Sequence, residues 1–112
     1  MQISQAQLDE VIAHAQEDAP NECCGYMKLR EGRVEEVVRA TNEKNSPYAY
    51  ELDPRSLYGA WKLSEYEGYE IAIYHSHPRS SPQPSQTDIN LAHYPHWLYL
   101  IVSLEFSELI EC

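Results

Sequence analysis

The sequence predicts an α/β fold in which helices sandwich a mixed, mainly antiparallel β-sheet. Three observations lead to this fold class. One helical pattern precedes the first predicted hairpin, and a second precedes a strand that ends in two histidines. The segment Trp97–Leu104 is apolar almost throughout, which is typical of a central strand covered on both faces. At 112 residues, 43% of them hydrophobic, the chain has the length of one domain, 1–112, with a modest core.

The first predicted element is a helix over Ser4–Glu17. Ser4 and Gln7 fit a capping box, and apolar residues recur behind them at helical spacing. Pro20 and Asn21 end this helix.

Three strands are predicted next. Cys23–Leu29 and Val34–Ala40 flank the turn Arg30–Arg33, which indicates a hairpin. After a polar loop, Tyr48–Leu52 alternates between apolar and polar residues, and this pattern favours a half-buried strand.

The second helix is predicted to begin at Asp53-Pro54, an N-cap followed by proline at the first helical position, and to stop at Gly68. A strand over Tyr69–Tyr74 follows and continues to the histidines; Ile89–His93 forms a short helical turn before the central strand. The tail, Glu105–Cys112, has an ambiguous pattern.

Most of the expected chemistry lies between Tyr74 and Asp88. His75 and His77 alternate on one strand, so their side chains share a face with about 6.6–7 Å between their backbones. A polar, proline-rich loop then leads to Asp88, whose carboxylate can fold back to the same point. Two imidazoles and one carboxylate, with a fourth position for water, are the pattern of a catalytic zinc site.

Two other interpretations use the same residues. Ser85 to Asp88 also fits a helix capping box, in which both residues are only structural. A Cys/His hydrolase would use Cys23 or Cys24 with one of the histidines, but it leaves Ser85 and Asp88 without a role; a buried strand position suits Cys24 better.

The motif His75-x-His77-Pro78, followed after six residues by Ser85 and after two more by Asp88, resembles the signature of the JAMM (MPN-plus) zinc metalloproteases and isopeptidases. The resemblance covers nearly the whole chain and implies the JAMM/MPN, cytidine deaminase-like architecture. Relatives have more strand after the segment equivalent to Trp97–Leu104. The sheet is therefore expected either to lack an edge strand or to gain a short one from Phe106–Cys112.

The resemblance also assigns the remaining site residues. Pro20-Asn21-Glu22-Cys23-Cys24-Gly25 is similar to the Pro-x-Glu-x-Cys-Gly segment of small bacterial members, in which the glutamate is the catalytic base, so the base is expected to be Glu22. Ser85 is expected to hydrogen-bond the oxyanion, and the expected cofactor is Zn²⁺.

Composition narrows the partners and the location. The formal net charge of −10 makes nucleic acid a poor partner. The sequence has no apolar run of membrane-spanning length and a polar N-terminus, so no membrane partner is expected and a cytoplasmic location is the default. Three cysteines, two of them adjacent, favour reduced thiols over a disulfide framework.

The resemblance is strongest to the small bacterial CysO-cysteine peptidase-like branch, which trims the C-terminus of ubiquitin-like sulfur-carrier proteins. The expected substrate is therefore the tail of such a carrier, lying beside an exposed sheet edge at Tyr69–His77. A homodimer is left open. The alternatives are a non-catalytic MPN-type interaction module and a phage-tail or cell-wall peptidase.

Overall fold

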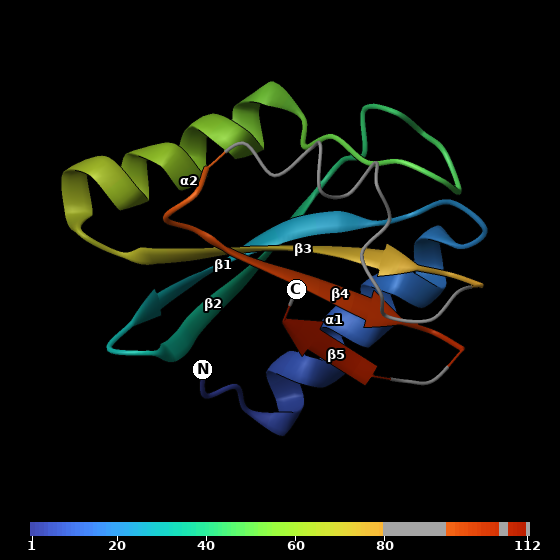
Figure 1. Ribbon diagram of the computed structural model, residues 1–112, viewed down its shortest axis with the longest axis horizontal. Helices are drawn as coiled ribbons and strands as arrows, with labels where there is room; N and C mark the ends of the chain where they lie inside the picture. Colours follow the sequence, from blue (N-terminus) through green and yellow to red (C-terminus); the bar gives the residue numbers. More distant parts are fainter. Residues whose placement is uncertain (80–93, 106–107, 112) are drawn as a thin grey trace.

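The computed structural model describes residues 1–79, 94–105 and 108–111. In these ranges a five-stranded sheet with strand order β2-β1-β3-β4-β5 carries two helices (Figure 1). β3 and β4 are parallel, and the other neighbouring strands are antiparallel. This arrangement confirms the predicted mixed, mainly antiparallel sheet. In chain order the elements are α1 (Gln5–Asp18), β1 (Cys24–Arg30), β2 (Arg33–Ala40), α2 (Pro54–Glu67), β3 (Glu70–His77), β4 (Leu98–Ser103) and β5 (Glu108–Glu111).

Both predicted helices are confirmed, and local caps explain their starts. Before α1, the Ser4 hydroxyl accepts a hydrogen bond from the Gln7 N–H (3.1 Å) and the Gln7 side chain accepts one from the Ser4 N–H (3.0 Å). Before α2, Asp53 accepts a hydrogen bond from the Ser56 N–H (3.1 Å). α2 ends at Gly68, whose φ of 71° lies in the left-handed region that favours glycine.

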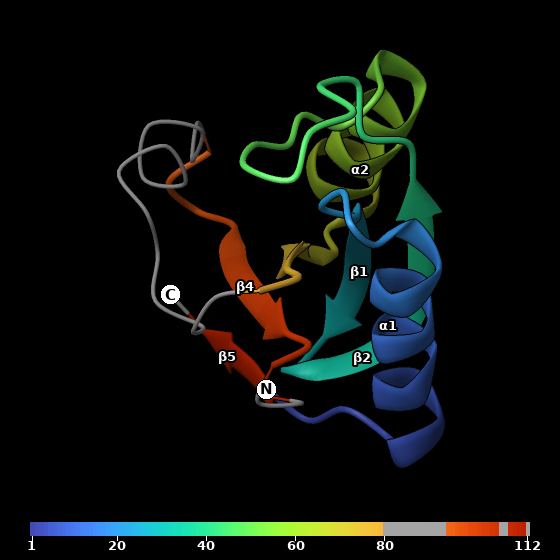
Figure 2. The same cartoon turned by 90° about the vertical axis from the view of Figure 1, so that its right-hand side faces the viewer.

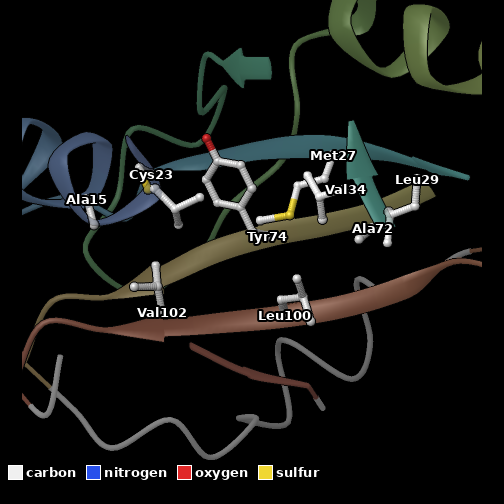
Figure 3. Close-up of a cluster of buried hydrophobic side chains, with 10 residues drawn as sticks. Ala15, Cys23, Met27, Leu29, Val34, Ala72, Tyr74, Leu100 and Val102 are labelled. Atoms are coloured by element: carbon white, nitrogen blue, oxygen red, sulfur yellow. The ribbon is translucent and has the colours of Figure 1, made fainter. Parts of the chain in front are cut away.

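Each helix covers one face of the sheet, as the alternating strand pattern requires. In Figure 1, α2 runs above the sheet and α1 lies behind it; Figure 2 shows α1 standing beside β2. The α1 face is built from Val11, Ala15, Cys23, Met27, Leu29, Val34, Ala72, Tyr74, Leu100 and Val102 (Figure 3). The α2 face is built from Cys24, Tyr26, Ala40, Tyr50, Leu52, Ala60, Ile71, Ile73 and Trp97.

The predicted strand over Tyr48–Leu52 is wrong. The segment makes only an isolated bridge, between Leu52 and Asn42. The Asn42 side chain accepts a hydrogen bond from the Glu51 N–H (3.0 Å), so a side chain takes a backbone group that a neighbouring strand would have used. The alternating burial remains, because Tyr50 and Leu52 are both buried.

The sheet edge that the sequence left open is a short strand. β5 pairs antiparallel with β4, so the shortened-strand alternative is confirmed. The expectation of an exposed edge at Tyr69–His77 is wrong, because β3 is hydrogen-bonded to β1 on one side and to β4 on the other. A substrate tail therefore has no free edge of β3 to pair with.

Among the described residues, no helix is both long and apolar enough to cross a membrane.

Candidate active site

The end of β3 presents two histidines on one face of the sheet. The ring centroids of His75 and His77 lie 5.2 Å apart with an interplanar angle of 60°. Both side chains are buried, at 1% and 5% exposure. β3 is held between two neighbours, with His75 opposite Cys24 on β1 and Ile101 on β4. Two imidazoles fixed this close together fit two ligands of one metal ion.

A tyrosine holds the first of these rings. Tyr50 stacks on His75 with 4.2 Å between ring centroids and an interplanar angle of 13°. The segment that carries Tyr50 packs against the sheet through Leu52 as well, so the stack is part of the α2-face core. The alternating pattern indicated that Tyr50 is buried, but nothing in the sequence pairs it with His75.

The sheet register places Glu22 beside the histidines. β1 and β3 are antiparallel, with Cys24 opposite His75. The alignment continues past the end of β1, because the Ser76 N–H donates to the Cys23 carbonyl (3.1 Å), and it therefore sets Glu22 opposite His77. Opposite residues of an antiparallel pair point to the same face. Glu22 is 4% exposed, so its carboxyl group is buried at this end of the sheet.

The backbone around Glu22 is anchored on both sides. The Glu22 N–H donates to the Ser46 carbonyl (2.9 Å), and the Glu22 carbonyl accepts from the Asn42 side-chain amide (3.0 Å). The Ser76 hydroxyl accepts from the Cys23 N–H (2.7 Å). Neither Asn42 nor Ser76 is marked as a site residue by any pattern in the sequence. Asparagine in a polar loop signals a local turn, but its bond to Glu22 depends on the fold.

A second buried polar group lies on the opposite face of β3. The Tyr74 hydroxyl is 2.7 Å from His14 Nδ1, and His14 Nε2 is 3.4 Å from an Asp18 carboxylate oxygen. Burial lowers the pKa of His14 and raises that of Tyr74. The Tyr74 ring passes directly over Gly25, where a Cβ would lie 2.5 Å from Tyr74 Cζ. His14 is therefore a packing residue that ties α1 to the strand that bears the two site histidines.

The two adjacent cysteines are core residues. Cys23 and Cys24 are free thiols with 0% exposure. Burial raises the pKa of Cys23 to about 12 and raises that of Cys24 as well. A nucleophilic cysteine needs a lowered pKa, so the Cys/His hydrolase alternative has no suitable nucleophile in this pair.

Ser85, Asp88 and the predicted helical turn Ile89–His93 lie outside the described residues. Within 1–79, 94–105 and 108–111, no group of three or more His, Cys, Asp and Glu side chains is arranged to hold a metal ion. The structure thus brings together two of the three predicted ligands and the predicted base. The roles of all five site residues remain predictions.

Two hollows border the loop that carries Tyr48 and Tyr50. One is an apolar cavity of about 220 Å³ whose walls include Tyr50, Ile73 and Trp97. The other, of about 290 Å³, is lined by Pro20, Pro47, Tyr48, Pro78 and Arg79. Either hollow could take part of a substrate, one next to Tyr50 and the other next to the end of β3.

Comparisons with known proteins agree with this geometry. The family model described as prokaryotic homologs of the JAB domain matches residues 4–110. The chain is 35% identical over 99 residues to the CysO-cysteine peptidase of Mycobacterium tuberculosis, covering 86% of this chain and 68% of that protein. It is 36% identical over 104 residues to the desampylase of Haloferax volcanii, covering 85% and 74%.

Solved structures give the same result. A protein from Desulfitobacterium hafniense matches with a TM-score of 0.80 and 34% identity, covering 97% of this chain and 79% of that one. A JAB1/MPN domain protein from Archaeoglobus fulgidus matches with a TM-score of 0.61 and 19% identity, covering 99% and 89%, and this likeness shows the fold.

The fold is that of the JAB1/MPN domains, an α/β domain. The chain belongs to the family of prokaryotic homologs of the JAB domain. The JAMM-type family and fold predicted from the sequence are confirmed. The predicted enzyme class is confirmed as well, because the curated relatives are named as a peptidase and a desampylase.

Proposed function

We propose that the chain is a zinc-dependent peptidase or isopeptidase that hydrolyses an amide bond at the C-terminal tail of a ubiquitin-like or sulfur-carrier protein. The single observation that carries the proposal is the β1–β3 register, which sets Glu22 opposite His77. His77 follows His75 by two residues, so all three side chains belong to the same face of the sheet. The relatives named CysO-cysteine peptidase and desampylase support the substrate class.

The donor set fits zinc. His75 and His77 offer two imidazoles within reach of one ion, and Asp88 supplies a carboxylate as the third ligand. When bound, zinc would polarise the scissile carbonyl and make a water molecule acidic enough to attack at neutral pH. The stack of Tyr50 on His75 limits rotation of that ring and so favours a fixed direction for its lone pair.

Glu22 is the proton carrier of the proposed reaction. It takes a proton from the attacking water and delivers it to the leaving amine as the C–N bond breaks, so the tail gains a carboxylate and the leaving group a free amine. Its anchored backbone, held by Ser46 and Asn42, keeps the carboxylate at one position. Ser85 donates a hydrogen bond to the carbonyl oxygen as negative charge develops there, a contribution of about 3–4 kcal/mol.

The substrate tail is extended and carries glycines next to the scissile bond, because residues without side chains let the backbone pass close to the buried histidines. It lies across the face of the sheet, since both edges of β3 are occupied. The apolar cavity beside Tyr50 is suited to an upstream apolar side chain. With a net charge of −10, the chain favours a carrier with a neutral or basic docking face.

A cytoplasmic location is also part of this proposal, and fractionation of the host cells would test it. Homodimer formation stays a prediction, which light scattering of the purified chain would check.

Two variants test the function. His77→Ala is expected to purify with much less zinc than the wild type, whereas Glu22→Gln keeps the zinc and loses cleavage of a carrier ending in Gly-Gly-Cys. Metal analysis and mass spectrometry of the released residue are the measurements. Equal zinc in wild type and His77→Ala would refute the metal centre, and wild-type turnover by Glu22→Gln would refute the base.

The same experiment separates the alternatives. A non-catalytic interaction module would purify without stoichiometric zinc and leave the carrier intact. A cell-wall or phage-tail peptidase would cleave a peptidoglycan stem peptide and leave the carrier tail intact.

A further inference from the structure

The groove at the end of β3 contains a cationic side chain. Its volume is about 290 Å³, and it is lined by Pro20, Pro47, Tyr48, Pro78 and Arg79. Ligand pockets usually span about 300–1,000 Å³, so this groove suits a single amino-acid residue rather than a folded partner. We call it the proline groove.

The proline groove adjoins the proposed active site on two sides. Pro78 directly follows His77, and Pro20 comes two residues before Glu22. The loop that supplies Pro47 and Tyr48 is joined to the same place, because the Ser46 carbonyl accepts the Glu22 N–H (2.9 Å). In Figure 1 the end of β3, the α1–β1 connection and the loop after β2 gather at one end of the sheet. A group leaving the site can therefore enter this groove.

Arg79 is the charged member of the groove. It is exposed, and in the part of the chain that the structure describes it has no carboxylate within 4.0 Å. Lys28, Arg30, Arg39 and Lys44 each have such a partner. The chain has 18 acidic residues against 8 Lys and Arg. A cation that has no carboxylate partner among the described residues is therefore suited to an anionic ligand.

Arg79 is the one charged residue among the five described residues that line the groove, and Tyr48 adds a hydroxyl group. Three of the five lining residues are prolines, which have no backbone N–H to donate. A guanidinium group binds a carboxylate through two parallel hydrogen bonds, a geometry that a lysine does not reproduce. The shape and chemistry of the groove match a small residue that ends in a free carboxylate.

We propose that Arg79 binds the C-terminal carboxylate of the residue that is released. This inference rests on the proposed function and deepens it. The preferred substrate is then a carrier tail extended by one amino acid, and the enzyme acts as a trimming carboxypeptidase. In an isopeptide bond the leaving amine is a lysine side chain of a second folded protein. It carries no carboxylate that Arg79 could bind, so such a conjugate is the poorer substrate.

The test uses two synthetic peptides that end in Gly-Gly-Cys, one with a free carboxylate and one with a carboxamide. The zinc-loaded wild type is expected to cleave the carboxylate peptide with a kcat/KM about fivefold higher, as for a well-placed, solvent-exposed ion pair. Arg79→Gln is expected to cleave both peptides equally, at the wild-type rate for the carboxamide. Arg33→Gln, at the far end of the sheet, is the matched control and keeps the preference.

A binding measurement makes the result independent of turnover. In a Glu22→Gln background, titration calorimetry is expected to show about fivefold tighter binding of the carboxylate peptide, and Arg79→Gln is expected to remove that difference. A preference that survives Arg79→Gln, or equal binding of the two peptides, overturns the inference. Arg79-dependent carboxylate binding without cleavage of either peptide leaves the inference standing and refutes the peptidase.

Discussion

Replacing Gly25 by alanine tests the contact that holds β3 against β1 next to the histidines. The added Cβ would lie 2.5 Å from Tyr74 Cζ, from Tyr74 Oη and from the Val38 carbonyl oxygen. The carbonyl belongs to β2 and cannot swing away, so the strands or the tyrosine must move. If Tyr74 moves, its hydrogen bond to His14 is broken.

The cost follows from these two effects. Overpacking of a core costs about 1–3 kcal/mol, and a buried polar partner left without its hydrogen bond costs about 1–3 kcal/mol more. A gain of about 0.4–1 kcal/mol from the stiffer unfolded chain offsets part of this. We expect a net loss of about 3 kcal/mol. At about 4 °C per kcal/mol for a domain of this length, Tm falls by about 12 °C.

Thermal unfolding followed by circular dichroism, with chelator present, measures the change. Gly59→Ala is the control, since its Cβ would meet only the Tyr26 hydroxyl, at 3.2 Å, and alanine favours the helix α2 by about 1 kcal/mol. Gly59→Ala is therefore expected to melt within about 3 °C of the wild type. A Gly25→Ala protein that melts as close to the wild type would refute the reasoning.

Three further predictions concern buried side chains. Burial lowers the pKa of His14 below its ordinary 6.5, so on acidification the unfolded chain binds a proton at this histidine before the folded chain does. The free energy of unfolding of the wild type is therefore expected to fall as the pH drops below about 6.5. Urea midpoints at pH 7.5 and 5.5 measure this change, which is expected to be larger in the wild type than in His14→Gln. Cys23 and Cys24 are expected to resist iodoacetamide at pH 8 in the native protein, as peptide mass spectrometry would show, and rapid alkylation of either would contradict their assignment as core residues. Tyr50→Ala is expected to lose about 3 kcal/mol in urea unfolding and part of its zinc occupancy; unchanged values for both would show that the stack on the first histidine is unimportant.

The sequence predicted best where the determinants are local. The starts of both helices follow from Ser4 and Asp53, whose side chains bond N–H groups three residues away. The shared face of His75 and His77 follows from the two-residue period of a strand. These features need no knowledge of which segments meet, so one sequence is enough to predict them.

Features that depend on distant segments were missed or came only from the family resemblance. The strand predicted over Tyr48–Leu52 failed because Asn42, nine residues before Glu51, bonds to that segment through its side chain. Glu22 was assigned from the resemblance, and its position opposite His77 follows from the β1–β3 register. Two features leave no periodic signal in the sequence: the burial of β3 between two strands, and the absence of a carboxylate near Arg79 among the residues that the structure describes.

The antiparallel β1–β3 pairing also places the proposed active site and the β1–β2 turn at opposite ends of the sheet, and this turn is a suitable place to attach a fluorescent label. Leu29 is opposite Glu70 at the start of β3, and Glu70 lies about 23 Å from His77 at 3.3 Å per residue. The turn at Glu31 and Gly32 lies beyond that end of the strand. Gly32 has no atom within 4 Å of where a Cβ would be. A donor fluorophore at Glu31 would sit within energy-transfer range of an acceptor on a bound carrier tail, far enough away to report docking without touching the reacting groups.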